Sequence, residues 1–68
     1  MGHAPTTRLE PMQPPYGTCP VCGSADWPAE YRVRSIARPD LSLTCCALVA
    51  CIHATERAVR ALLKENKP

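Results

Sequence analysis

The residues Cys19-Pro20-Val21-Cys22-Gly23 decide the fold of this chain. Two thiols separated by two residues lie on the same side of a tight loop, and Gly23 lets the backbone turn back where a Cβ would be in the way. Cysteine thiolates are soft ligands that select zinc or iron. Because two ligands do not complete a tetrahedral site, the rest of the chain must supply two more.

Candidates for the second pair of ligands lie in one later cluster: Cys45, Cys46, Cys51 and His53. Alternation along the preceding strand places Cys45 on the inward, apolar face, whereas Cys46 falls where the chain turns into a helix, so Cys46 is favoured over Cys45. Cys51 adjoins the apolar stripe of that helix and His53 lies on its polar side, which favours Cys51. Cys46 and Cys51 would point about 140° apart in a regular helix, so we expect regular helix only after about Leu48.

The length of the chain makes such a metal site necessary for folding. The chain has 68 residues, one Trp, two Tyr and no Phe, and below roughly 70–80 residues a hydrophobic core rarely stabilises a domain without a staple. The five cysteines are an odd number and no apolar leader precedes them, which favours reduced thiolates over a disulfide scaffold. We therefore expect a cytoplasmic protein, with no segment apolar enough to cross a membrane.

The chain divides into a tail and one small domain. Residues 1–17 are rich in proline and show no apolar period, so we expect a disordered N-terminal tail there. Residues 18–68 form the predicted zinc-binding domain. Trp27, the largest side chain, is expected to fill the core of that domain, and a stacking platform for a nucleic-acid base is the alternative role.

The secondary structure predicted for the domain is a β-hairpin followed by a helix. Residues 31–46 alternate with a period of two around a turn at 38–40 that contains Pro39, which predicts a two-stranded hairpin. From about 47 to 65 the period becomes helical. The predicted core face of the helix comprises Leu48, Ile52, Thr55, Val59, Leu62 and Leu63. The fold class is therefore α+β: a Cys-x-x-Cys knuckle, a two-stranded hairpin and one long C-terminal helix.

This order of elements resembles a treble-clef zinc finger, the group that holds GATA-type fingers and many small bacterial zinc modules. The resemblance covers residues 19–65 and rests on Cys19-Pro20-Val21-Cys22-Gly23, the hairpin pattern and the Cys/His cluster that opens the helix. It implies one structural zinc, with two ligands from the loop and two from the helix start. It implies no single function, because this fold hosts many. The second pair departs from the usual spacing, since four residues separate Cys46 from Cys51.

The function predicted from these residues is a non-enzymatic zinc-finger binding module. Its predicted metal ligands are Cys19, Cys22, Cys46 and Cys51, and they hold one structural Zn²⁺. A catalytic zinc keeps an open position beside a general base, and Glu56 is the only acid near the cluster. We therefore expect neither an enzyme nor a small-molecule substrate.

Two partners are predicted for the surface of the module. Basic side chains on the helix and hairpin favour DNA or RNA; they are Arg32, Arg34, Arg57, Arg60 and Lys64. The alternative is a protein partner or a homodimer that uses an alanine-rich helix face, with zinc purely structural. That face comprises Ala47, Ala50, Ala54, Ala58 and Ala61.

Overall fold

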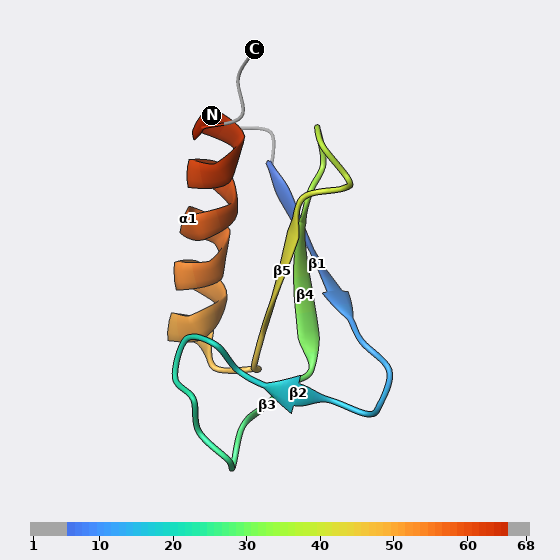
Figure 1. Ribbon diagram of the computed structural model, residues 1–68, viewed down its shortest axis with the longest axis vertical. Helices are drawn as coiled ribbons and strands as arrows, with labels where there is room; N and C mark the ends of the chain where they lie inside the picture. The colour runs from blue at the N-terminus through green and yellow to red at the C-terminus, as the bar shows by residue number, and fades with distance from the viewer. Residues whose placement is uncertain (1–5, 66–68) are drawn as a thin grey trace.

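The computed structural model describes residues 6–65. A three-stranded antiparallel sheet, in the order β1-β4-β5, is covered on one face by the single helix α1, and a short ribbon of β2 and β3 lies at one end (Figure 1). The elements are β1 Thr7–Pro11, β2 Gly17–Thr18, β3 Pro28–Ala29, β4 Tyr31–Ser35, β5 Ser42–Cys45 and α1 Val49–Glu65. The predicted α+β class is confirmed. Residues 1–5 of the predicted tail and residues 66–68 lie outside the described part of the chain.

The predicted hairpin consists of β4 and β5. Their antiparallel register pairs Val33 with Leu43, so that both side chains lie on the face that α1 covers. The turn closes where the Leu41 N–H donates to the Arg38 carbonyl at 2.8 Å. The Arg38 guanidinium also pairs with the Asp40 carboxylate at 3.1 Å.

Strand β1 corrects the prediction of a disordered tail over residues 1–17. It pairs antiparallel with β4, and Leu9 lies opposite Val33 on the helix side. On the outer face, the Arg34 Nε donates to the Glu10 Oε1 at 3.0 Å. The proline content predicts that this segment cannot compensate the entropy cost of becoming ordered. The hydrogen bonds to β4 and this ion pair offset that cost. The folded unit therefore begins by residue 7.

Helix α1 begins at Val49, two residues after the helical period starts in the sequence and where the angle between Cys46 and Cys51 predicts regular helix. The first described bond of the helix runs from the Ile52 N–H to the Leu48 carbonyl at 3.0 Å, and residues 46–48 are irregular, as the spacing of the cysteines required. Cys51, Thr55 and Val59 are its buried residues, and they face the sheet. Within residues 6–65, no helix is long and apolar enough to span a membrane.

The core is small and consists mainly of sulfur and valine side chains. Its buried members are Cys19, Val33, Cys45, Cys46, Cys51 and Val59. Trp27 is not among them: its side chain is 42% exposed, so the prediction that it fills the core is wrong. Trp27 lies in the loop between β2 and β3, outside the buried cluster.

Candidate metal centre

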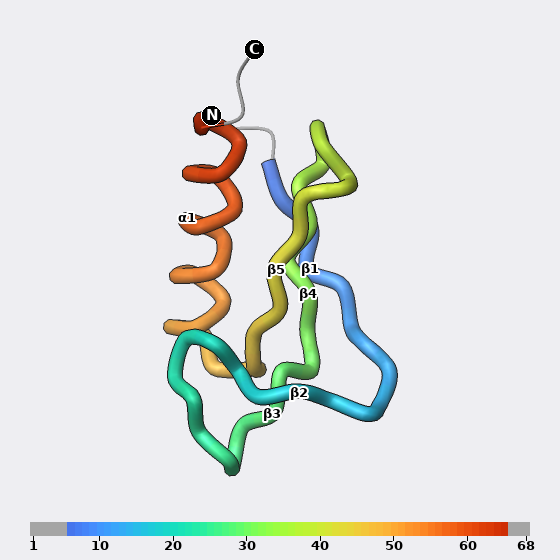
Figure 2. Tube along the Cα trace, in the orientation of Figure 1, coloured from blue at the N-terminus to red at the C-terminus, as the bar shows by residue number. Residues whose placement is uncertain are grey.

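Four cysteines from two distant segments meet at one end of the molecule. The sulfur atoms of Cys19, Cys22, Cys46 and Cys51 all lie within 4.8 Å of one another. The first two come from the loop between β2 and β3, which lies beside the first turn of α1 in Figure 2. Cys46 lies in the link between β5 and α1, and Cys51 lies in the first turn of α1. These are the four cysteines that the sequence selected.

The spacing of the sulfurs fits a tetrahedral metal ion. Zinc–sulfur bonds of about 2.3 Å place the corners of an S₄ tetrahedron about 3.8 Å apart, and the Cys22 and Cys46 Sγ atoms are 3.8 Å apart. A disulfide would require about 2.05 Å, and all five cysteines are free thiols. Four soft donors at this separation could hold a metal ion.

Backbone N–H groups lower the pKa of the Cys19 thiol. Burial would raise the pKa of the Cys19 thiol, but N–H groups of Cys22, Val21 and Cys46 donate to its sulfur and lower the pKa to about 6. Hydrogen bonds to a charged form favour that form. Cys19 is therefore ready to bind a cation near neutral pH.

The remaining buried thiols need a cation to ionise. Burial raises the pKa of Cys46, although the Leu48 N–H partly opposes that shift. Burial and the thiols of Cys46, Cys22 and Cys19 raise the pKa of Cys51 to about 12. A divalent metal supplies the charge that would release these protons, and this donor set therefore fits a metal ion.

The two alternative ligands lie outside the cluster. Cys45 is fully buried on the inward side of β5, and burial raises the pKa of its thiol. The Thr55 hydroxyl donates to the Cys51 carbonyl at 2.7 Å. The His53 imidazole is 64% exposed and its Nδ1 lies 3.3 Å from the Glu56 carboxylate. Strand alternation accounts for the inward position of Cys45, and helical periodicity accounts for the exposure of His53.

The knuckle depends on the backbone of Gly23. Its φ is +63°, a left-handed conformation that costs other residues roughly 1–2 kcal/mol. Its N–H donates to the Cys19 carbonyl at 2.8 Å, which closes the loop around the first two sulfurs. An added Cβ at Gly23 would meet no atom within 4 Å, so the requirement is conformational rather than steric.

Gly23→Ala is expected to lower the free energy of unfolding of the metal-loaded protein by about 1 kcal/mol. Urea denaturation at constant free zinc measures this loss. Gly17→Ala is the matched control, because an added Cβ at Gly17 also meets open space and its φ is not positive. Equal losses in both variants would show that the left-handed turn carries no special cost.

The five basic residues predicted to bind nucleic acid do not share one surface. Arg32 and Arg34 alternate with the buried Val33, so they lie on the sheet face away from α1. Arg57, Arg60 and Lys64 are exposed and lie about 140–180° around the helix from the buried Thr55. The two basic sets therefore face opposite sides of the molecule, because both elements pack through their apolar sides.

The alanine-rich face of α1 borders an apolar groove. The groove has a volume of about 220 Å³ and runs between the knuckle, β5 and α1. It is lined by Pro20, Val21, Leu43, Thr44, Ala54, Thr55 and Ala58. Part of the alanine face therefore contributes to a real concavity rather than to a flat surface.

Comparisons with protein-family models, with curated proteins and with solved structures find no match to this chain. The resemblance to treble-clef fingers therefore stays a prediction, and the function is argued from the site alone.

Sequence reasoning missed the residues that β1 brings to the outer face of the sheet. Arg8 and Glu10 lie opposite Arg34 and Arg32 on β4, and the Glu10 carboxylate neutralises part of the charge assigned to the hairpin. The alternation of Thr7, Arg8, Leu9 and Glu10 is the signal that could have revealed this strand. It is only a few residues long and is followed by prolines, which obscured it.

Proposed function

We propose that the chain is a non-enzymatic binding module held together by one structural zinc ion on Cys19, Cys22, Cys46 and Cys51. The convergence of four sulfurs within 4.8 Å is the observation that carries the proposal. The site joins the Cys-x-x-Cys loop to the start of α1, two segments that lie more than twenty residues apart in the sequence. Four protein donors fill a tetrahedral zinc, which leaves no open position for a reacting group.

We prefer zinc over iron on the spacing of the four ligands in the sequence. A tetrahedral thiolate site accepts either metal, and the rubredoxin type of iron site uses two Cys-x-x-Cys loops where this chain has one. Native mass spectrometry of the purified protein, with and without a chelator, gives the mass and number of bound ions. A strong visible absorption band with one iron per chain would contradict the assignment to zinc.

The proposed partner of the module is nucleic acid, bound by the outer face of α1. Arg57, Arg60 and Lys64 follow one another along that face, and none of them forms an ion pair with another described residue. On the opposite side of the molecule, Arg34 already bonds Glu10 and the Pro39 carbonyl. Unpaired cations are the groups that can replace the counterions of a phosphate backbone.

Binding to duplex DNA or RNA is expected to weaken steeply as salt rises. Three phosphate contacts give a slope of about −2.7 for log K against log [salt], which is about a 40-fold loss between 50 and 200 mM salt. Fluorescence anisotropy with a labelled duplex at several salt concentrations measures this slope. Each of Arg57→Gln, Arg60→Gln and Lys64→Gln should reduce its magnitude by about 1.

Arg8→Gln is the matched control, since it removes one charge from the sheet face opposite α1. It should leave the slope within experimental error of the parent protein. No binding at 20 mM salt, or equal effects of Arg8→Gln and Arg57→Gln, would contradict a nucleic-acid interface on α1.

A second copy of the chain is the alternative partner, and the groove beside the alanine face supports it. In the hairpin register the backbone groups of Ser42 and Thr44 point away from β4. No other strand within residues 6–65 pairs with β5, so this edge is open beside Ala54 and Ala58. A symmetric pair of β5 strands would bring the two alanine faces together. A mass that stays monomeric up to millimolar concentration in light scattering would exclude this dimer.

A further inference from the structure

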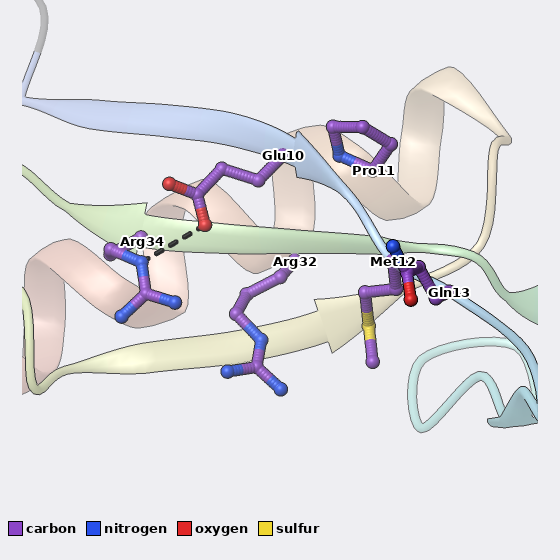
Figure 3. A pocket seen from close by; sticks show the side chains of 6 residues that line it. All are labelled: Glu10, Pro11, Met12, Gln13, Arg32 and Arg34. Atoms are coloured by element: carbon purple, nitrogen blue, oxygen red, sulfur yellow. Dashed lines mark hydrogen bonds and ion pairs between the residues drawn. The ribbon is translucent and has the colours of Figure 1, made fainter.

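A pocket on the outer face of the sheet lies away from both the cysteine cluster and α1. It has a volume of about 250 Å³ and lies where β1 leads into the segment that follows it. Its lining residues are Glu10, Pro11, Met12, Gln13, Arg32 and Arg34. Figure 3 shows both guanidinium groups projecting from β4 on this side, with the Met12 thioether beside Arg32.

The two arginines of this pocket differ in their contacts with the one acidic side chain, Glu10. Arg32 lies directly opposite Glu10 in the β1–β4 register, yet the Glu10 carboxylate bonds Arg34 instead, at 3.0 Å. Arg34 also donates from Nη1 to the Pro39 carbonyl. No side chain or carbonyl in residues 6–65 accepts a hydrogen bond from the Arg32 guanidinium. Among residues 6–65 the Arg32 guanidinium therefore has no hydrogen-bonded anion, and Arg32 is half-buried in a concave site.

The lining of this pocket is mostly polar, and Met12 and Pro11 give it a smaller apolar part. Together with the Arg32 guanidinium, these groups indicate a class of ligand. We propose that the pocket binds a small organic carboxylate, with Arg32 as its anion ligand and with the uncharged part of the molecule against Met12 and Pro11. A carboxylate presents two oxygens in one plane, which matches the planar fork of a guanidinium. The pocket holds two arginines and one glutamate, so a single negative charge neutralises it, whereas a phosphate dianion would be repelled by Glu10.

The volume of the pocket limits the size of the ligand. Sites for drug-sized molecules begin at about 300 Å³, so this pocket suits an acid of a few carbon atoms. The Gln13 amide offers both a donor and an acceptor to a further polar group on the ligand. The proposal concerns a bound ligand rather than a reacting substrate, and it does not depend on the zinc or the nucleic-acid proposal.

Titration of the zinc-loaded protein with acetate, butyrate and hexanoate tests this site by NMR at constant ionic strength. Saturable shifts are expected at Arg32, Met12 and Gln13, with affinity rising by up to about fourfold for each buried methylene. Inorganic phosphate and dimethyl phosphate are the other two probes. Inorganic phosphate is partly dianionic, and dimethyl phosphate is a monoanion without an alkyl chain to cover Met12 and Pro11, so both should bind at least about tenfold more weakly than hexanoate.

Three variants separate the pocket from general attraction to a basic surface. Arg32→Gln should weaken hexanoate binding at least about tenfold, because a charge-assisted pair is lost. Arg8→Gln removes the same charge from the same strand-paired face but outside the pocket, and it should change the affinity less than twofold. Glu10→Gln should tighten binding, since it removes a negative charge that repels the ligand carboxylate.

Several results would overturn the proposal. They are no saturable shift with any carboxylate, equal losses in Arg32→Gln and Arg8→Gln, weaker binding in Glu10→Gln, or dimethyl phosphate binding as tightly as hexanoate. The last result would assign the pocket to the phosphodiester of a nucleic acid instead. Because the Arg32 side chain bonds no other described residue, its removal should leave the zinc content and the helical signal unchanged, and both are measured alongside.

Discussion

Removal of the metal with a chelator under reducing conditions is expected to unfold the domain. Three of the four clustered cysteines are also members of the buried core, so an ion bound by them would be part of that core. Binding of zinc by small cysteine sites supplies about 10–16 kcal/mol, whereas a core of this size rarely supplies more than about 3–5 kcal/mol. The stripped chain should therefore lose its cooperative thermal transition.

Circular dichroism at 222 nm and an amide NMR spectrum measure this loss, and addition of one equivalent of zinc should restore both signals. A chelator already saturated with zinc is the control for effects of the chelator itself. If the stripped, reduced chain melts cooperatively within a few degrees of the zinc-loaded protein, the metal is not what holds the fold.

The adjacent residues Cys45 and Cys46 should respond in opposite ways to the same substitution. Cys46→Ser removes a sulfur from the cluster, and its zinc affinity should fall more than about 100-fold, since outer-shell changes alone cost 10–100-fold. Cys45→Ser places a hydroxyl in the core beside Thr55. It should keep one zinc per chain and lose roughly 1–3 kcal/mol of stability.

This pair is a strict comparison because both side chains are fully buried and both changes replace sulfur by oxygen. Competition with a chromophoric zinc chelator measures affinity, and urea denaturation at constant free zinc measures stability. Loss of zinc from Cys45→Ser with retention by Cys46→Ser would reverse the assignment of the third ligand. Equal zinc loss in both variants would indicate that the cluster responds to core damage rather than to ligand identity.

The features that could be predicted from the sequence are those with a local signal. The Cys-x-x-Cys loop carries its own turn residue in Gly23, and α1 repeats its apolar side chains over four turns. The choice of Cys46 over Cys45 followed from strand parity, and the irregular start of α1 followed from the angle between Cys46 and Cys51. Each of these predictions depends only on residues close together in the sequence and on the known periodicity of a strand or a helix.

The features that could not be predicted depend on partners distant in sequence. Strand β1 is ordered by β4, and the paired residues lie 20 to 28 positions apart along the chain. The size of its ring predicts a core position for Trp27. Its actual exposure depends on how the chain packs around the cysteines, which the sequence alone does not give. The separation of the basic residues depends on which side each element packs, and that is known only when sheet and helix are assembled.

The position of β1 also bears on how the protein should be handled. A fragment cut at residue 18, as the composition suggests, would lack the strand that covers one edge of β4. The N–H and C=O groups at that edge of β4, beside Val33, would then be unpaired. Another molecule could add a strand there, which leads to aggregation. Expression of this protein should therefore retain Thr7–Pro11, and a purification tag placed directly before Thr7 needs a flexible spacer.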